Sequence, residues 1–249
     1  MQYGICHLSI VSLRFEPSDK SELVSQVLYG EVFKVIEQRK KWSKIRLAFD
    51  KYEGWIDNKQ FLIIEKENYE NLSTEKLILS TDLVEFIEDT STQLYPIPIG
   101  STLNGLSLLN HTYDGITSSE QKHKSELIKT AFIYLNAPYL WGGKTPFGID
   151  CSGFTQMVYK LNGYKLRRDA SMQAAQGEAL SFIEESEPGD LAFFDNADGD
   201  IIHVGIIMED NYIIHAHGKV RIDRLDHSGI YNTEKNEHTH KLRVIKKII

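Results

Sequence analysis

Alternating apolar and polar residues dominate the first quarter of the chain. Runs such as Ile10–Phe15, Val32–Glu37 and Trp42–Leu47 approach the period of two that is typical of a half-buried strand. Turn-forming residues separate these runs, as at Glu16–Asp19. Residues 1–64 are therefore predicted to form a small all-β domain.

The next stretch carries weaker strand signals. After a polar linker at 65–68, four segments have the composition of strands: 76–80, 83–88, 93–99 and 103–109. Pro96 and Pro98 have no N–H to donate to a ladder, which favours an edge strand. Residues 65–117 are predicted to form a second, degenerate barrel or a meander that links to the next domain.

From residue 118 the apolar residues follow a helical period. A helix is predicted over about 118–136, ended by Pro138, and a glycine-rich loop follows it. Apolar residues then recur at helical spacing from Phe154 to Leu161, and Gly163 marks the stop. This spacing puts Cys151 in the first turn of a helix. A short helix is predicted over 172–178.

The remainder is rich in β-branched strands, which are predicted at 191–194, 202–208, 212–216, 220–225 and 242–248. His203 and His215 each lie inside an apolar run, and the turn at 209–211 is long enough for a hairpin. The two histidines are therefore expected side by side on one face of a sheet. Residues 118–249 are predicted to form an α+β domain.

Composition narrows the class of function. The chain has 249 residues with a formal net charge of −7, which argues against a nucleic-acid binder. Neither a membrane-spanning run nor a signal peptide is recognised, so a cytoplasmic location is expected, with a periplasmic or secreted one as the alternative. A monomer is expected as well. No cofactor and no metal are expected: the loop 196–200 has the composition of a plain turn, and 238–240 is predicted as a polar surface loop.

Cys151 is a candidate nucleophile. A helix N-terminus carries partial positive charge and free N–H groups, which favour a thiolate and lower the pKa of the thiol. Asp150 is a suitable N-cap. The alternative interpretation is that Cys151 is a small buried apolar residue. A disulfide with Cys6 is not expected if Cys151 reacts as a free thiol.

A set of short motifs follows in order between Ala131 and Ala216. They are Trp141-Gly-Gly, Asp150-Cys-Ser-Gly-Phe, Leu166-Arg-Arg-Asp-Ala-Ser171 with Gln173, Pro188-Gly-Asp-Leu, His203-Val-Gly-Ile and Ile214-His-Ala. This ordered set resembles the NlpC/p60 family of cell-wall cysteine endopeptidases. The resemblance implies a papain-like catalytic domain. The first 64 residues resemble a bacterial SH3-type barrel, with Leu13-Arg-Phe-Glu-Pro, Leu28-Tyr-Gly-Glu and Gly54-Trp-Ile carrying the likeness. By the same comparison, 65–117 is expected to be SH3-like.

The resemblance also assigns roles. It implies Cys151 as the nucleophile, His203 as the general base, His215 as the group that orients it, and Tyr139 as a donor to the oxyanion. Arg168, Asp169 and Ser171 match the family's substrate wall. Where the family usually has proline, this chain has Arg167. Proline would stiffen the loop, so we expect the substrate-lining loop to be less rigid here.

The substrate class follows from the resemblance alone. Family members cut the γ-D-glutamyl–diamino acid bond of peptidoglycan stem peptides. The subgroup with an N-terminal SH3-type domain and no signal peptide resembles recycling enzymes for fragments with a free N-terminal L-alanine. Glu16, Tyr52, Asp150 and Ser152 match the positions that bind this ammonium. Two alternatives stay open: an amidase or acyltransferase on the same scaffold, and a wall-binding protein without activity.

Overall fold

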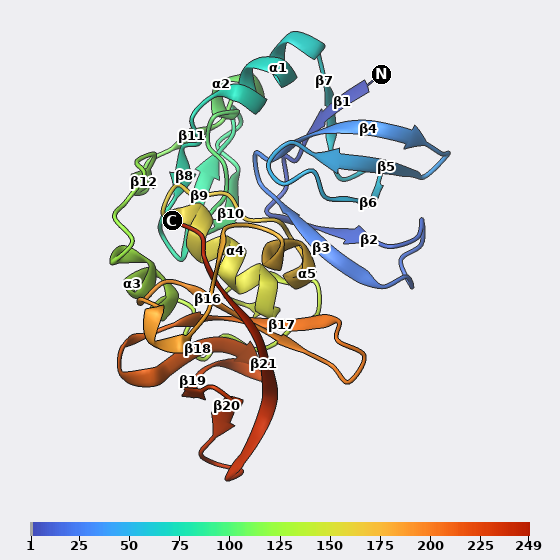
Figure 1. The fold of residues 1–249 in the computed structure, drawn as a ribbon. Helices are drawn as coiled ribbons and strands as arrows, with labels where there is room; N and C mark the ends of the chain where they lie inside the picture. The colour runs from blue at the N-terminus through green and yellow to red at the C-terminus, as the bar shows by residue number, and fades with distance from the viewer. Residues whose placement is uncertain (1) are drawn as a thin grey trace. The chain divides into compact units, whose positions relative to one another are not determined.

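The computed structural model describes residues 2–249 as two compact units (Figure 1). Unit 1 extends to Glu120 and includes the segment Trp141–Pro146. Unit 2 consists of Gln121–Leu140 and Phe147–Ile249. The predicted first domain begins at Met1, which lies outside the described residues. The α+β class predicted for the chain is confirmed, with an all-β, SH3-like region at the N-terminal end.

Unit 1 contains a strongly curved antiparallel sheet in the order β3-β2-β6-β5-β4-β1-β7. The predicted strands of this region are confirmed. Their bounds are β1 Gln2–Ile5, β2 Ile10–Arg14, β3 Leu23–Leu28, β4 Val32–Gln38, β5 Trp42–Leu47, β6 Glu53–Asp57 and β7 Leu62–Ile64.

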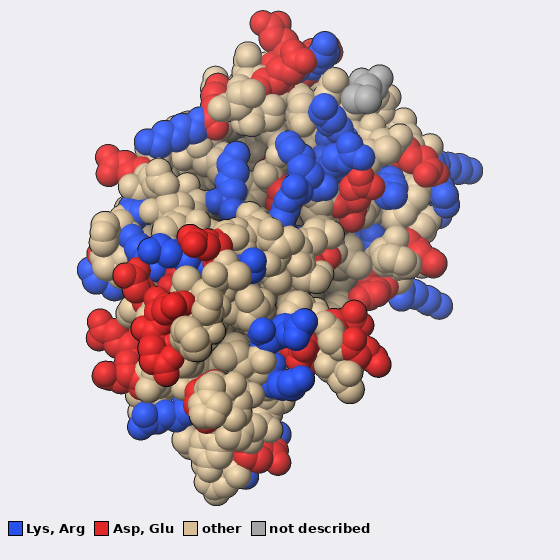
Figure 2. Space-filling view, in the orientation of Figure 1, with Lys and Arg blue, Asp and Glu red and all other residues tan. Residues whose placement is uncertain are grey.

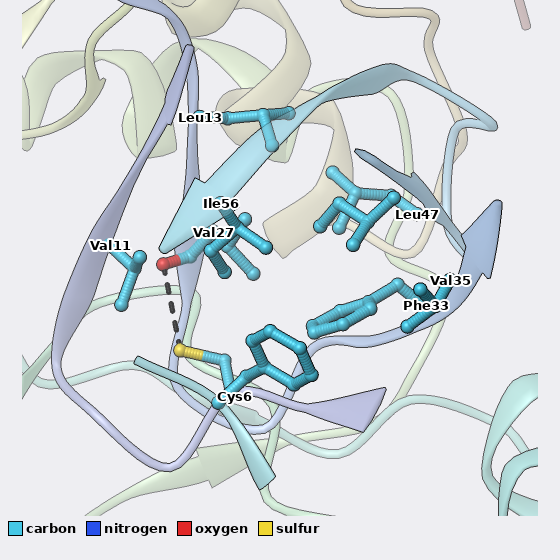
Figure 3. Close-up of a cluster of buried hydrophobic side chains, with 10 residues drawn as sticks. Cys6, Val11, Leu13, Val27, Phe33, Val35, Leu47 and Ile56 are labelled. Atoms are coloured by element: carbon cyan, nitrogen blue, oxygen red, sulfur yellow. Dashed lines mark hydrogen bonds between the residues drawn. The ribbon is translucent and has the colours of Figure 1, made fainter. Parts of the chain in front are cut away.

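The inward positions of these strands form one apolar core. Figure 3 shows Val11, Leu13, Val27 and Phe33 converging with the other side chains of this cluster. The thiol of Cys6 lies among them and contacts the carbonyl oxygen of Val27 at 3.9 Å. Burial raises the pKa of Cys6 to about 12, so this cysteine is an unreactive part of the core.

The stretch after the barrel differs from two sequence predictions. The expected polar linker is wrong, because Lys66–Thr74 forms helix α1, whose Tyr69 stacks on Tyr3 with ring centroids 4.5 Å apart. The strand expected at 103–109 is also wrong, because Leu106–Leu109 forms the short helix α2. The remaining elements are β8 Leu79–Ser80, β9 Val84–Glu88, β10 Leu94–Pro98, β11 Thr112–Tyr113 and β12 Thr117–Ser118.

Strand β10, which contains Pro96 and Pro98, lies at the edge of the three-stranded sheet β10-β9-β11, as predicted. The assignment of 65–117 to a second SH3-like barrel or a meander stays a prediction.

The glycine-rich loop that precedes Cys151 in the sequence contributes Trp141–Pro146 to unit 1. Lys144, the first residue of β13 (Lys144–Thr145), is buried and its Nζ lies 3.3 Å from Oε1 of buried Glu31. Its backbone N–H donates to Oε1 of Gln26 at 2.7 Å, and the Trp141 indole donates to Glu22. Gly142 has φ +76°, and a Cβ there would lie 2.4 Å from the Leu23 carbonyl oxygen. Only glycine fits this approach.

Unit 2 is built on a closed antiparallel barrel. Strand β21 pairs with β16 on one edge and with β15 and β20 on the other, which closes the order β21-β16-β17-β18-β19-β20 on itself. The strands are β14 Gly148–Ile149, β15 Glu178–Leu180, β16 Leu191–Asp195, β17 Ile201–Ile207, β18 Tyr212–His217, β19 Lys219–Asp226, β20 Gly229–Asn232 and β21 Glu237–Lys247.

Three α-helices accompany the barrel: α3 Glu126–Phe132, α4 Cys151–Leu161 and α5 Ala170–Ala174. Two single turns, η1 Ile183–Glu185 and η2 Glu209–Asn211, complete the unit. Helix α4 packs on β17 and β18 (Figure 1). The helix predicted over 118–136 is shorter than expected, because Ser118 ends strand β12 and only 126–132 is α-helical. The helix predicted over 172–178 begins earlier and ends at Ala174.

On the face drawn in Figure 2, acidic and basic side chains are interspersed. The described residues on this face form no continuous stripe of positive or of negative charge. Among residues 2–249, no helix combines the length and the apolar character that a membrane crossing requires.

Candidate active site

Helix α4 places Cys151 at its first position. Asp150 precedes it in an extended conformation, with φ −93° and ψ 178°, and its carboxylate accepts a hydrogen bond from the backbone N–H of Gly153 at 2.6 Å. This is the geometry of an N-cap, which satisfies one of the free N–H groups of the first turn. The thiol therefore lies at the positive end of a buried helix, as the sequence predicted.

A buried ion pair fixes the start of this helix. Arg168 donates from Nη2 to Oδ2 of Asp150 at 2.6 Å and from Nη1 to Oδ1 at 2.9 Å. Nη1 also donates to Oγ of Ser152 at 3.0 Å. The side chains of Arg168 and Asp150 are 1% and 8% exposed. Such a two-pronged pair is the strong form of the arginine–carboxylate interaction.

The loop that carries Arg168 is held by side-chain amides. Gln156 on α4 donates to the carbonyl of Leu166 at 3.1 Å, and Gln173 on α5 donates to the carbonyl of Arg167 at 2.8 Å. The N–H of Arg167 donates to Gln176 at 2.7 Å, a bond that proline could not make. The loosening expected from Arg167 is therefore offset by hydrogen bonds.

His203 and His215 lie on one face of adjacent strands. Gly205 of β17 is opposite His215 of β18. His203 is two residues before Gly205 on β17, so its side chain lies on the same face of the sheet as that of His215. Nε2 of His203 is 2.8 Å from Nδ1 of His215. The other ring nitrogen of His215, Nε2, is 2.9 Å from Oδ2 of Asp223 on β19.

The thiol of Cys151 lies beside strand β17, which carries His203. Its sulfur is within hydrogen-bond reach of the backbone N–H of Val204, the residue after His203. Burial raises the pKa of this thiol to about 12 and the Asp150 carboxylate acts in the same direction, while the Val204 N–H group and Arg168 lower it by less. Burial, followed by the neighbouring histidines, lowers the pKa of His203 well below its ordinary value.

The pKa shift of Cys151 is opposite to the one predicted from the sequence. The helix N-terminus is present, but the loss of water around the sulfur outweighs it. That prediction is therefore wrong for the free site. These shifts make both the Cys151 thiol and the His203 imidazole neutral at pH 7 in the free site.

We expect the reaction of Cys151 with iodoacetamide to speed up about tenfold per pH unit between pH 7 and 9, because the thiolate fraction grows that way below the pKa. Mass spectrometry of the labelled peptide, in a Cys6→Ala background, follows the rate. A plateau that begins below pH 7 would show a preformed thiolate and contradict the neutral pair.

Comparison with known proteins identifies two domains in the chain. The sequence pattern of the NlpC/P60 family matches residues 136–239, and that of the bacterial dipeptidyl-peptidase Sh3 domain matches residues 13–61. The chain carries an NlpC/P60 domain. The geometry around Cys151, His203 and His215 lies wholly within it.

Relatives extend the likeness over most of the chain. Dipeptidyl-peptidase 6 of Lysinibacillus sphaericus is 28% identical over 256 residues, which cover 87% of this chain and 89% of that protein. The gamma-D-glutamyl-L-lysine dipeptidyl-peptidase of Bacillus subtilis is 28% identical over 217 residues, 77% of this chain and 71% of that one. A crystal structure of an NlpC/P60 family protein from Bacillus cereus shares the fold over 99% of both chains, with a TM-score of 0.81 at 22% identity.

The other predicted residues fall in several places. Tyr139 in the NlpC/P60 domain is half-buried. Burial, and then the nearby Cys151 and Asp150, raise the pKa of its phenol. Asp169 is the N-cap residue of α5, and Ser171 is exposed on that helix. In unit 1, Glu16 is exposed in the turn after β2, and Tyr52 packs against the barrel core. The ligand roles of these residues stay predictions.

His240 lies at the site, although the sequence did not predict it there. The expected surface loop at 238–240 is wrong, because these residues belong to β21. The His240 ring stacks on His203 with centroids 4.2 Å apart and planes 26° apart. Burial and the nearby His215 and His217 lower its pKa to about 3, so it is a neutral neighbour of His203. One signal in the sequence could have indicated this position. His240 is two residues before Leu242 in a strand, and residues two apart lie on the same face.

Asp223 was missed as well. It is a carboxylate at an inward position of an apolar strand, two residues before Leu225. A charged residue at such a position is seldom buried without a partner. Among residues 2–249, no group of three or more histidine, cysteine or carboxylate side chains is arranged to hold a metal ion.

Proposed function

We propose that this protein is a cysteine peptidase that hydrolyses the γ-D-glutamyl–diamino acid bond of peptidoglycan stem peptides. The observation that carries the proposal is a thiol at a helix N-terminus that reaches the backbone of strand β17 next to His203, which in turn is hydrogen-bonded to His215, within an NlpC/P60 domain. The class of bond is supported by the gamma-D-glutamyl-L-lysine dipeptidyl-peptidase, which aligns with 77% of this chain.

The reaction proceeds in two halves. The Cys151 sulfur attacks the carbonyl carbon, the S–H proton passes to His203, and a tetrahedral oxyanion forms. His203 then returns this proton to the leaving amine as the C–N bond breaks, which leaves a thioester on Cys151. In the second half, water loses a proton to His203 and attacks the thioester, and the released thiol regains that proton.

Tyr139 is proposed to donate to the oxyanion. Burial, and then the nearby Cys151 and Asp150, raise the pKa of its phenol, so the O–H stays protonated and can donate. We expect Tyr139→Phe to lower kcat by about 10² to 10³, the usual cost of one oxyanion donor. KM for the tripeptide should change little. A kcat within threefold of the wild type would exclude this role.

We further propose that the enzyme recognises the free amino terminus of its substrate. A fragment with a free N-terminal L-alanine carries an ammonium, and a buried ammonium needs carboxylate partners. Glu16, Tyr52, Asp150 and Ser152 are the proposed ligands. A substrate of this kind is a released fragment of the wall, and we propose a cytoplasmic location for its breakdown.

The test compares L-Ala-γ-D-Glu-diamino acid tripeptides with free and N-acetylated amino ends, and follows products by mass spectrometry. We expect release of L-Ala-D-Glu from the free peptide only, and no release by Cys151→Ala. A Glu16→Gln variant should raise KM for the free peptide. Equal cleavage of both peptides would contradict the ammonium pocket but keep the peptidase.

Cleavage of neither peptide would contradict the proposed function. Turnover of other amides or esters by the same preparation would then identify an amidase or acyltransferase on this scaffold. A thiol that stays unreactive at high pH, together with no turnover of any of these, would identify a protein without catalytic activity.

A further inference from the structure

The hydrogen-bonded chain that starts at His203 ends on an ion pair. Oδ2 of Asp223 accepts a hydrogen bond from Nε2 of His215. The same carboxylate forms an ion pair with Arg221 on its own strand. Arg221 donates from Nε to Oδ2 at 2.7 Å and from Nη2 to Oδ1 at 2.9 Å. The side chain of Asp223 is 1% exposed, so this carboxylate is fixed in position and shielded from water.

The register of the sheet makes this contact possible. His215 is opposite Arg221 in the pairing of β18 with β19, and Asp223 is two positions further on the same face. Such diagonal neighbours in an antiparallel pair are within reach of long side chains. His203, His215 and Asp223 therefore come from three consecutive strands and form a line across one face.

An ionised carboxylate fixes the protons along this line. Burial opposes the ionisation of Asp223, but hydrogen bonds from His215 and Arg221 outweigh it and lower its pKa. A carboxylate only accepts, so Nε2 of His215 must carry a proton. In a neutral imidazole the other nitrogen, Nδ1, is then an acceptor. It faces Nε2 of His203, which must donate.

Nδ1 of His203 is left without a proton. It is the one ring nitrogen of His203 that this line does not use, and a general base needs that free lone pair. Through its hydrogen bond to His215, and through that of His215 to His203, Asp223 thus determines which nitrogen of His203 can accept the thiol proton.

We propose that Asp223, held by Arg221, is a positioning residue of the hydrolysis: it sets the tautomers of His215 and His203 and so keeps Nδ1 of His203 ready to accept the proton of Cys151. This inference rests on the proposed cysteine hydrolysis. The competing explanation gives Asp223 a structural role only, as the partner that neutralises the Arg221 guanidinium.

Asp223→Asn separates these explanations. Asparagine keeps one acceptor oxygen where the carboxylate has two. When Nη2 of Arg221 holds this oxygen in the place of Oδ1, the amide N–H₂ takes the place of Oδ2, faces Nε2 of His215 and requires an acceptor there. The proton of His215 moves to Nδ1, and His203 is protonated at Nδ1 in turn. A comparable change in a Ser-His-Asp triad lowers kcat about 10⁴-fold through the wrong tautomer. We expect a loss of about 10² to 10⁴ in kcat on the tripeptide, with KM within about threefold.

Asp226→Asn is the matched control. Asp226 lies on the same strand and also pairs with a histidine, since its Oδ2 is 2.9 Å from Nε2 of His238. That pair is half-exposed and outside the site. We expect its kcat to stay within twofold of the wild type. Asp223→Glu retains the carboxylate and should recover part of the activity that Asp223→Asn loses.

Ring ¹⁵N chemical shifts of histidine-labelled protein give the decisive readout, because a purely structural role would not move them in this way. In the wild type we expect neutral His203 and His215 to carry protons on Nε2. In folded Asp223→Asn both should carry them on Nδ1. Unchanged tautomers in the variant, or a kcat within threefold of the wild type, would overturn the proposal.

The wild-type spectrum tests the inference even if Asp223→Asn does not fold, because a proton on Nδ1 of His215 contradicts it directly. Failure of the wild type to cleave any stem peptide contradicts the proposed function instead. The spectrum still decides the tautomers in that case, so the two failures are distinguishable.

Discussion

Cys151→Ala abolishes turnover of the stem tripeptide, with an expected loss in kcat of about 10⁶-fold, the scale seen when a catalytic nucleophile is removed. The proposed chemistry forms a thioester at Sγ, and no other thiol of the site can replace it. The variant should fold, because alanine removes only one buried sulfur from the first turn of α4. Single-turnover mass spectrometry of tripeptide and products measures the loss.

Cys6→Ala is the matched control for this variant. Cys6 is the second cysteine of the chain and is equally buried, but its thiol lies in the barrel core of unit 1. We expect kcat to stay within about twofold and the free energy of unfolding of unit 1 to fall by about 1 kcal/mol. Residual turnover by Cys151→Ala above one part in a thousand would assign the chemistry to another group.

Arg168→Met has the second largest expected effect. It leaves the Asp150 carboxylate buried without its guanidinium partner, and breaking a buried pair in this way costs about 3–5 kcal/mol. Asp150 caps α4 and adjoins Cys151, so the loss should fall on the first turn of that helix. We expect both a lower free energy of opening for unit 2 and a strong loss of kcat.

Native-state hydrogen exchange of amides in α4 and β17 reports this free energy for unit 2 alone. Lys129→Met serves as the control, because its pair with Glu126 on α3 of unit 2 is exposed on both sides, with side chains that are 74% and 38% exposed. Such a pair contributes under about 1 kcal/mol. If Arg168→Met costs as little as Lys129→Met, the ion pair does not hold the helix start.

Local patterns predicted much of the site. Asp150, the apolar spacing from Phe154 to Leu161, and Gly163 define a helix that begins at Cys151, and each signal lies within a few turns of chain. The alternation around His203 and His215, with a short turn between them, defines the hairpin. The ordered motifs then indicated an NlpC/P60 domain, and the sequence pattern of that family matches residues 136–239.

Other features could not be predicted from local patterns. The helix at 66–74 has a composition typical of a linker, and its position depends on Tyr69 packing on Tyr3 at the other end of the barrel sequence. His240 enters the site because β21 closes the barrel against both β16 and β20. The period of two can place His240 on one face with Leu242, but it does not show which distant strands β21 pairs with.

The sequence by itself determined which residue types stand at the helix start and on the histidine strands, because side-chain periodicity is a local property of the backbone. The tertiary structure alone decided that Asp223 completes the line from His203, and that burial raises the pKa of the Cys151 thiol instead of lowering it. Both depend on which distant segments meet. Desolvation is a sum over all the atoms that exclude water from a group, and those atoms come from every part of the fold.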